Sequence, residues 1–305
     1  MRNTEQPPEV EGPLPPEIAP PAGAAAGARF DPIPFGAGAA RVAVDVLYLD
    51  DAFLALNKPA GWATSPDAVD PGPDLLSALH EGIRAGAPWA RRLGLVHLAA
   101  AHRLDRDTTG VFLLARSRET HFAAAGLFGH RRVAETYAAL VRGAPDEDAW
   151  RVDRPIGPAT AGAGAARAGG ARSRPAATAG EVAERFRGYA LLRARPETGR
   201  RRQVRLHLRA MGCPVVADAA CGDARPLMLS SIKRGYKPSA GDERPLLARS
   251  ALHLETLEFE HPVTRRPVRI EAPWPKDLLL AVKYLRRFAA PRRPHGDIEI
   301  GARGA

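Results

Sequence analysis

The alternation of apolar and polar positions divides the first half of the chain into strands and helices. In residues 41–61, "RVAVDVLYLDDAFLALNKPAG", the alternation stops at the paired aspartates and at the final Pro-Ala-Gly, which predicts two strands, each followed by a turn. Residues 74–83 place leucines at the spacing of a short amphipathic helix. Residues 109–117, "TGVFLLARS", predict a buried strand, and residues 118–132 predict the helix that follows it.

The second half of the chain predicts further strands. Residues 135–145, "ETYAALVRGAP", alternate as one strand, and residues 244–275 alternate as a pair of strands around a turn at 262–264. The order of elements has no regular strand-helix-strand rhythm. The sequence therefore predicts an α+β fold with a mixed, mainly antiparallel sheet flanked by helices.

The composition of the chain sets the expected domain limits. Residues 1–40 are rich in Pro, Ala and Gly and poor in large apolar side chains, which predicts a flexible tail. The folded domain is expected at residues 41–290, interrupted by a low-complexity surface loop at 159–180 and followed by a C-terminal tail at 291–305.

Length and residue content indicate a cytosolic protein. The chain has 305 residues, of which 45% are hydrophobic, but no stretch approaches the roughly 18 apolar residues that span a membrane, and the N-terminal residues lack the apolar core of a secretory signal. The two cysteines, Cys213 and Cys221, are too few for a disulfide scaffold, so we expect reduced thiols.

The charge of the chain favours a polyanionic partner. The 44 basic and 34 acidic residues give a net charge of +10, and arginine supplies most of the excess. The planar guanidinium suits phosphate, which makes nucleic acid the favoured partner. A GC-rich genome that encodes arginine in place of lysine would produce the same composition, so charge alone leaves both readings open.

The stretch "AAHRLDRDTTGVFLLARS", residues 100–117, contains the first candidate for chemistry. Asp105 lies between two arginines, on a loop that leads into the buried strand, and such rigidly held loops often carry functional groups. The carboxylate could instead cap its own turn. It could also form a glycosidase-like pair with Asp107, although neither side chain has the apolar surroundings that would keep it protonated as a general acid.

Several motifs together resemble one family of enzymes. "HRLDRDTTG" is similar to the signature of the RluA-like RNA pseudouridine synthases, and "LALNKPAGWATSPD", "ETYAALVRG", "PETGRRRQVRLHLRAMGCPVVAD" and "ALHLETLEFEHPVTRRPVRIEAPWP" resemble further family segments in the same order. The resemblance extends from about residue 54 to residue 275. It implies the pseudouridine synthase catalytic fold with a central RNA-binding cleft, and an enzyme that isomerises uridines of ribosomal or transfer RNA.

The resemblance also implies three catalytic residues, Asp105, Tyr137 and Arg205. Asp105 matches the family's catalytic aspartate, Arg205 its cationic partner, and Tyr137 the tyrosine that packs against uracil and is implicated in proton transfer. Patterning alone permits other roles. Tyr137 alternates like a core residue, and in a helix ending near Gly212 the side chain of Arg205 would share a face with Arg201 and Arg209 that could be solvated or bind phosphates.

Further residues of the same motifs are expected to contact the RNA substrate. These residues are His102, Arg103, Arg106, Thr109, Arg200, Arg201, Arg202 and Gln203. The chain departs from the family pattern at three places: Glu135 stands where a basic residue is usual, Arg202 replaces a histidine, and the end of the third motif reads Ala217-Asp218 and Cys221-Gly222. We expect these departures to affect RNA selection more than chemistry.

No metal and no cofactor is expected. The histidines at 102, 207, 253 and 261 are not spaced as a ligand set, and no glycine-rich dinucleotide or phosphate loop follows a strand. Residues 1–40 are too short and too proline-rich for the S4-type module that many relatives carry.

The expected partner is RNA, with no membrane and no obligatory protein partner, and the expected state is a monomer. The alternative is a catalytically silent RNA-binding or ribosome-assembly protein on the same fold.

Overall fold

The computed structural model describes residues 30–36, 42–68, 70–157, 173–236 and 243–291. The strands of these residues are β1 (Ile33–Phe35), β2 (Val42–Val44), β3 (Val46–Leu49), β4 (Phe53–Lys58), β5 (Ala99–Ala100), β6 (Thr109–Ala115), β7 (Val133–Arg142), β8 (Ala149–Asp153), β9 (Ala177–Phe186), β10 (Tyr189–Pro196), β11 (Leu252–Glu260) and β12 (Pro267–Glu271). The helices are α1 (Leu75–Arg84), α2 (Pro88–Arg92), α3 (Arg118–Gly129), α4 (Gln203–Ala210), α5 (Leu229–Ile232) and α6 (Lys276–Phe288).

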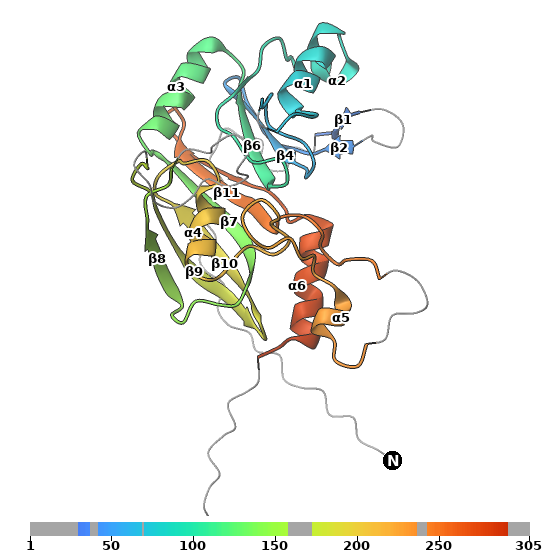
Figure 1. The fold of residues 1–305 in the computed structure, drawn as a ribbon. Coiled ribbons are helices and arrows are strands. Elements are labelled where there is room, and N and C mark those ends of the chain that lie inside the picture. The colour runs from blue at the N-terminus through green and yellow to red at the C-terminus, as the bar shows by residue number, and fades with distance from the viewer. Residues whose placement is uncertain (1–29, 37–41, 69, 158–172, 237–242, 292–305) are drawn as a thin grey trace, which may run out of the picture.

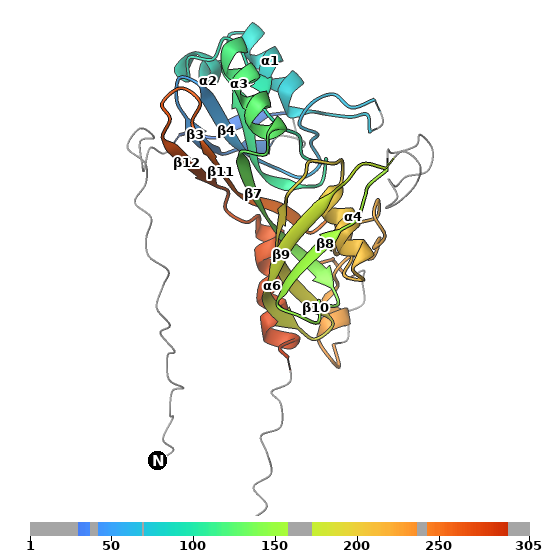
Figure 2. The same ribbon diagram turned by 90° about the vertical axis from the view of Figure 1, so that its left-hand side faces the viewer.

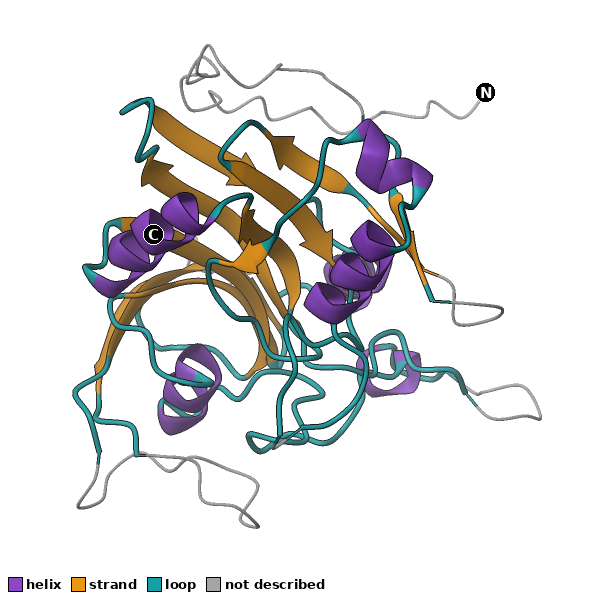
Figure 3. Cartoon of the chain, turned by 90° about the horizontal axis from the view of Figure 1, so that it is seen from above, coloured by secondary structure: helices purple, strands orange, loops and turns teal. Residues whose placement is uncertain are grey.

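One large sheet runs through the described part of the chain. Its strand order is β3-β4-β6-β11-β7-β10-β9-β8, with β5 beside β6 and β12 beside β11. The β6-β11 pairing is parallel, whereas the other pairings within this sheet are antiparallel. Seen from above, the strands fill the middle of the molecule and helices lie around them (Figure 3). The predicted α+β fold with a mixed, mainly antiparallel sheet is confirmed.

The central strands β4 and β6 are covered on both faces. Leu54, Leu56, Phe112 and Leu114 belong to one apolar cluster, whereas Phe53, Ala55, Val111 and Leu113 belong to the other. Because successive side chains of a strand point to opposite faces, a strand between two cores must be apolar at every position. This explains why "TGVFLLA" is a continuous apolar run, and every residue of β6 is buried.

Helices cover the two parts of the sheet. Figure 1 shows α1, α2 and α3 around β4 and β6, and α4, α5 and α6 around the strands β7 to β10. Helix α1 begins where the Asp74 side chain accepts a hydrogen bond from the Ser77 amide, and α3 begins with the same arrangement between Ser117 and Thr120. Both helices were predicted from the sequence and are confirmed.

Three details of the predicted organisation are wrong. Strand β1 lies within the predicted tail, and its buried Ile33 and Phe35 pack into the core around α1 and α2. Residues 42–58 form three strands in place of the two predicted for 41–61, because the extended segment is interrupted at Asp45 between β2 and β3. Strand β9 begins at Ala177, inside the predicted 159–180 loop, whereas residues 158–172 lie outside the described residues, as do 1–29 and 292–305.

The parallel pairing of β6 with β11 positions the loop that carries Asp105. Gly110 has φ +115°, and a Cβ atom there would lie 2.1 Å from the carbonyl oxygen of Leu254 on β11. Only glycine permits this approach of two backbones. The Asp-Thr-Thr-Gly turn is therefore held directly against the centre of the sheet. Figure 2 shows β7 and β11 in this central position, with α4 beside β8 and β9.

Candidate active site

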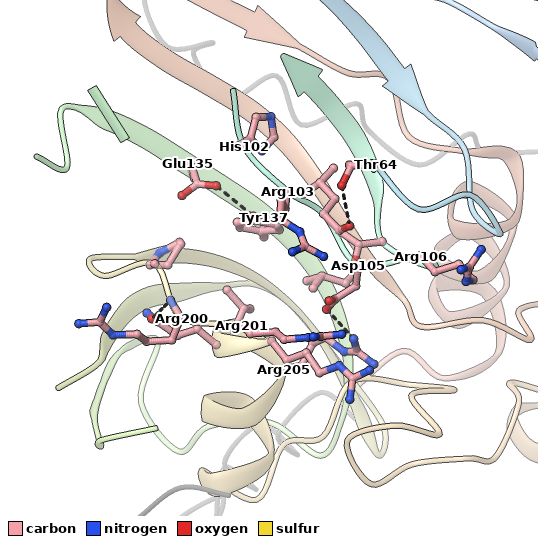
Figure 4. Close-up of a pocket in the computed structure, with 18 of the residues that line it drawn as sticks. Thr64, His102, Arg103, Asp105, Arg106, Glu135, Tyr137, Arg200, Arg201 and Arg205 are labelled. Atoms are coloured by element: carbon pink, nitrogen blue, oxygen red, sulfur yellow. Dashed lines mark hydrogen bonds and ion pairs between the residues drawn. The ribbon is translucent and has the colours of Figure 1, made fainter. Parts of the chain in front are cut away.

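A pocket of about 750 Å³ lies between the loop before β6, strand β7 and the N-terminal end of α4. Seven arginines and five acidic residues contribute to its lining, among them Asp105, Tyr137 and Arg205. The structure thus brings together the three residues that the family resemblance singled out, from positions up to 100 residues apart (Figure 4). The excess of guanidinium groups over carboxylates makes the pocket suited to an anionic ligand.

The Asp105 carboxylate is held by a buried arginine. Arg205 Nη1 donates to Asp105 Oδ2 at 2.5 Å, and the two side chains are 7% and 24% exposed. The other side of the Arg205 guanidinium donates to both oxygens of Asp218, with Nε 2.7 Å from Oδ2. Burial lowers the pKa of Arg205, but the hydrogen bonds of Asp218 and the charge of Asp105 outweigh it and raise the pKa overall. Arg205 is therefore a permanent cation beside Asp105.

The position of Arg205 settles one alternative left open by the helical pattern. Val204 and Leu208 of α4 are buried as expected, but Arg205 is only 6% exposed. Helix α4 begins at Gln203, so Arg201 precedes it, while Arg209 near its end is exposed. The three arginines therefore do not form one solvated face.

A buried lysine supports the turn that carries Asp105. Lys58 Nζ donates to the carbonyl oxygens of Pro59 and Arg106, both at 2.8 Å, and the Thr108 amide donates to the carbonyl oxygen of Asp105. Burial lowers the pKa of Lys58 to about 7, although the charge of Asp107 acts against this shift. The lysine thus connects the end of β4 to the loop that carries Asp105.

Tyr137 lies on β7 at the wall of the pocket. Its ring is 8% exposed and packs in the larger apolar cluster, so it is a core residue and a pocket residue at once. The hydroxyl donates to Glu135 Oε1 at 3.1 Å, as the dashed line in Figure 4 shows. Burial, together with the charge of Glu135, raises the pKa of Tyr137 well above its ordinary value.

Two arginines from opposite sides of the pocket meet at one carboxylate. Arg103, on the Asp105 loop, donates to Asp67 Oδ2 at 2.8 Å, and Arg201, before α4, donates to the same oxygen at 3.0 Å. The Arg103 side chain is 61% exposed and that of Arg201 is 36% exposed, whereas Asp67 is 13% exposed. Both guanidinium groups remain accessible from the pocket.

The other predicted arginines line the pocket but make structural contacts. Arg106 donates to the Asp70 carboxylate and to the carbonyl oxygens of Gly61, Asp70 and Pro73, so it holds the loop before α1. Arg200 Nε donates to the carbonyl oxygen of Pro175. Arg202 precedes α4 with φ 57°, a left-handed conformation that turns the chain into the helix.

Three of the predicted substrate contacts have other partners. Thr109 is 2% exposed, does not line the pocket and pairs with His253 Nδ1, so it is not positioned to contact a substrate there. The Gln203 amide is engaged with Ala177, Thr178, Thr198 and Arg200. His102 lines the pocket, but its Nε2 accepts from the Leu113 amide and burial lowers its pKa to about 4, so it is neutral at pH 7. The latter two residues shape the pocket wall.

Three carboxylates and one lysine that organise the site were not among the site residues predicted from the sequence: Asp67, Glu135, Asp218 and Lys58. Each lies within or beside a quoted motif, so the motifs located the region without showing the contacts. A charged residue at the end of an apolar strand, as in "FLALNK", was the signal available for Lys58.

The described residues contain neither a candidate metal site nor a candidate membrane span. There, no group of three histidine, cysteine, aspartate or glutamate side chains could hold a metal ion. Within the same residues, the helices are too short or too polar to cross a membrane.

Comparison with known proteins defines the class of the chain. Residues 52–210 match the family model described as RNA pseudouridylate synthase. The chain belongs to this family and is an RNA pseudouridine synthase of the RluA-like type, an isomerase. An isomerase leaves its RNA intact, so the alternative of a glycosidase does not apply. Because an isomerase is catalytically active, the alternative of a silent RNA-binding protein does not apply either.

Individual relatives are similar over most of the chain. "Ribosomal large subunit pseudouridine synthase D" of Xanthomonas campestris is 36% identical over 253 residues, 82% of this chain and 71% of that protein. "Ribosomal large subunit pseudouridine synthase C" of Escherichia coli is 34% identical over 243 residues, 79% of this chain and 70% of that protein. The solved structure of human RNA pseudouridylate synthase domain containing 4 shares the fold, with a TM-score of 0.60 at 22% identity over 79% of this chain and 92% of that one.

Proposed function

We propose that this enzyme converts specific uridines of large-subunit ribosomal RNA to pseudouridine, in the cytoplasm, with Asp105, Tyr137 and Arg205 as its catalytic residues. The names of the relatives support ribosomal RNA over transfer RNA as the substrate. The observation that carries the catalytic proposal is the Asp105–Arg205 pair in a pocket lined by arginines. Since every group in the proposal comes from one chain, we expect a monomer that needs no protein partner.

The reaction requires one carboxylate at the sugar. Pseudouridine formation breaks the bond between C1′ and N1, turns the uracil and joins C5 to C1′, so nothing is added or lost. Asp105 acts either as a nucleophile on C1′ or as the base that removes the C2′ proton. Arg205 keeps the carboxylate in place and beside a positive charge, and Asp218 keeps Arg205 in place. Tyr137 packs against the uracil and takes part in proton transfer.

The target uridine must leave its stack to reach Asp105. Flipping a base costs a few kcal/mol, least in loops, and contacts with neighbouring phosphates offset that cost. Arg103 and Arg201 are the arginines best placed for this role, because their side chains are exposed and approach the pocket from opposite sides.

Replacing Arg103 and Arg201 together by alanine should weaken the salt dependence of RNA binding. Each lost contact with a single-stranded phosphate lowers the slope of log K against log salt by about 0.7, so we expect a change of about 1.4. Titrations of RNA at several salt concentrations measure the slope, and turnover at saturating RNA should stay near wild type. An unchanged slope would show that these arginines do not contact phosphate.

Asp67→Asn tests whether this carboxylate occupies the place of an RNA phosphate. If a phosphate displaces Asp67 from the two arginines, removing the carboxylate charge should tighten RNA binding by about two- to fivefold. This factor corresponds to the free energy of a partly exposed ion pair, which the phosphate would no longer have to break. The turnover number should not change. Weaker binding would instead mean that Asp67 holds Arg103 and Arg201 in their binding positions.

The target itself is tested by mapping pseudouridines in total RNA from a strain that lacks the gene and from its parent. We expect the loss of one or more sites in large-subunit ribosomal RNA, restored by the wild-type gene and not by an Asp105→Asn gene. Loss of sites only in transfer RNA would contradict the proposed substrate.

A further inference from the structure

Glu135 is the one acidic residue in direct contact with the Tyr137 hydroxyl among the described residues. It lines the pocket two positions before Tyr137 on β7, and its side chain is 10% exposed. The family resemblance places a basic residue at this position. A basic neighbour would stabilise a deprotonated tyrosine, whereas a carboxylate does the opposite. The carboxylate of Glu135 therefore favours the protonated form of Tyr137.

The direction of the hydrogen bond determines what Tyr137 can offer to a substrate. Its only proton points to Glu135 Oε1, so the remaining lone pair of the phenol oxygen is the part of the hydroxyl that can face another group. Burial and the charge of Glu135 both raise the pKa of Tyr137, so it stays a phenol at neutral pH. A phenol is a weak base unless its own proton leaves as a new one arrives.

Glu135 is placed to accept that proton. Burial raises the pKa of Glu135, and the charge of Arg131 and the hydrogen bond from Tyr137 offset this rise only in part. Arg131 Nη2 lies 3.8 Å from Glu135 Oε2 and also donates to the carbonyl oxygen of Pro196, while its Nε donates to that of Glu197. Arg131 therefore stabilises the ionised form of Glu135 near Oε2, the oxygen that does not accept from Tyr137.

We propose that Glu135 is a positioning residue that receives, through Tyr137, the proton that C5 of the uracil loses after it has joined C1′. In this step the C5–H bond breaks and its electron pair forms the C5–C6 double bond. The electron pair of the C6–N1 double bond moves to N1, which takes a proton from water. The C5 proton passes to the Tyr137 oxygen as the phenolic proton passes to Glu135, which later releases it to solvent.

The inference rests on the proposed role of Tyr137 in proton transfer, and Glu135→Gln tests it. Glutamine keeps the shape and can accept the tyrosine hydrogen bond, but it cannot take up the proton. We expect kcat to fall about 10²-fold or more, as for loss of a general base, with KM for RNA within twofold of wild type. The substrate is total RNA from a strain that lacks the gene, so an error in the proposed target does not affect the test.

A kinetic isotope effect separates this role from a merely structural one. RNA from the same strain grown with uridine deuterated at C5 should react more slowly than ordinary RNA with the Glu135→Gln enzyme, by a clearly larger ratio than with wild type. The reason is that removal of the C5 proton should be the slowest step in the Glu135→Gln enzyme. A slower variant with an unchanged isotope effect would mean that Glu135 only maintains the pocket, and the proposal would be wrong.

A double variant tests whether Glu135 acts through Tyr137. Glu135→Gln combined with Tyr137→Phe should be no slower than Tyr137→Phe alone, because the relay is already broken. If the losses of turnover in the two single variants multiply in the double variant, Glu135 does not act through Tyr137. If Tyr137→Phe is slow and Glu135→Gln is fully active, the role of Glu135 is wrong and the role of Tyr137 in proton transfer stands. If Tyr137→Phe is fully active, the proposed role of Tyr137 is itself wrong. The matched control is Glu147→Gln, at an exposed position between β7 and β8.

Discussion

Asp105→Asn should abolish pseudouridine formation while leaving the fold and the RNA affinity close to wild type. Asparagine has nearly the same shape, and its amide oxygen can still accept from Arg205, but it provides neither a nucleophile nor a base for the sugar. Losing one partner of a buried ion pair costs about 3–5 kcal/mol when the remaining charge is left uncompensated. Here Arg205 keeps both hydrogen bonds with Asp218, so we expect a much smaller loss of stability.

Three measurements check this expectation: single-turnover pseudouridine formation, RNA binding and thermal unfolding. The matched control is Asp107→Asn, two residues along the same loop, where the side chain is exposed. This control should retain turnover, since the mechanism needs one carboxylate. Substantial turnover by Asp105→Asn would overturn the mechanism. A loss of activity in both variants would mean that the reaction needs both Asp105 and Asp107.

Tyr137→Phe should lower turnover by about 10²- to 10⁴-fold, the usual contribution of general acid–base catalysis. The ring remains, so packing in the core and stacking on uracil are kept, and RNA binding should stay near wild type. The variant leaves Glu135 with its ion pair to Arg131, which limits the cost of the lost hydrogen bond. Turnover and affinity measured separately decide the role, because weaker binding with normal turnover would make Tyr137 a stacking residue alone.

Local patterns were sufficient to predict much of the architecture. The periodicity of apolar residues predicted helix α1 and the β11-β12 pair, because these elements bury side chains at a regular spacing that the sequence displays directly. Strand β6 was predicted from its continuous run of apolar residues, and α3 as the helix that follows it. Strand β1 was missed because it has three residues, too few to show a period, and is stabilised by its pairing with β2 and by packing of Phe35 against Trp62 and Trp89.

The sequence by itself determined the family, the order of the core elements and the loop that carries Asp105, since motif residues and apolar periodicity are local properties of the chain. Only the tertiary structure decided which motif residues face the pocket. In the folded chain Thr109 faces His253, and Arg106 holds a neighbouring loop. Asp105 lies against Arg205, which is 100 residues further along the chain and is itself held by Asp218. A charged side chain takes its role from the partners that folding brings within hydrogen-bonding distance, and those contacts leave no periodic signal in the sequence.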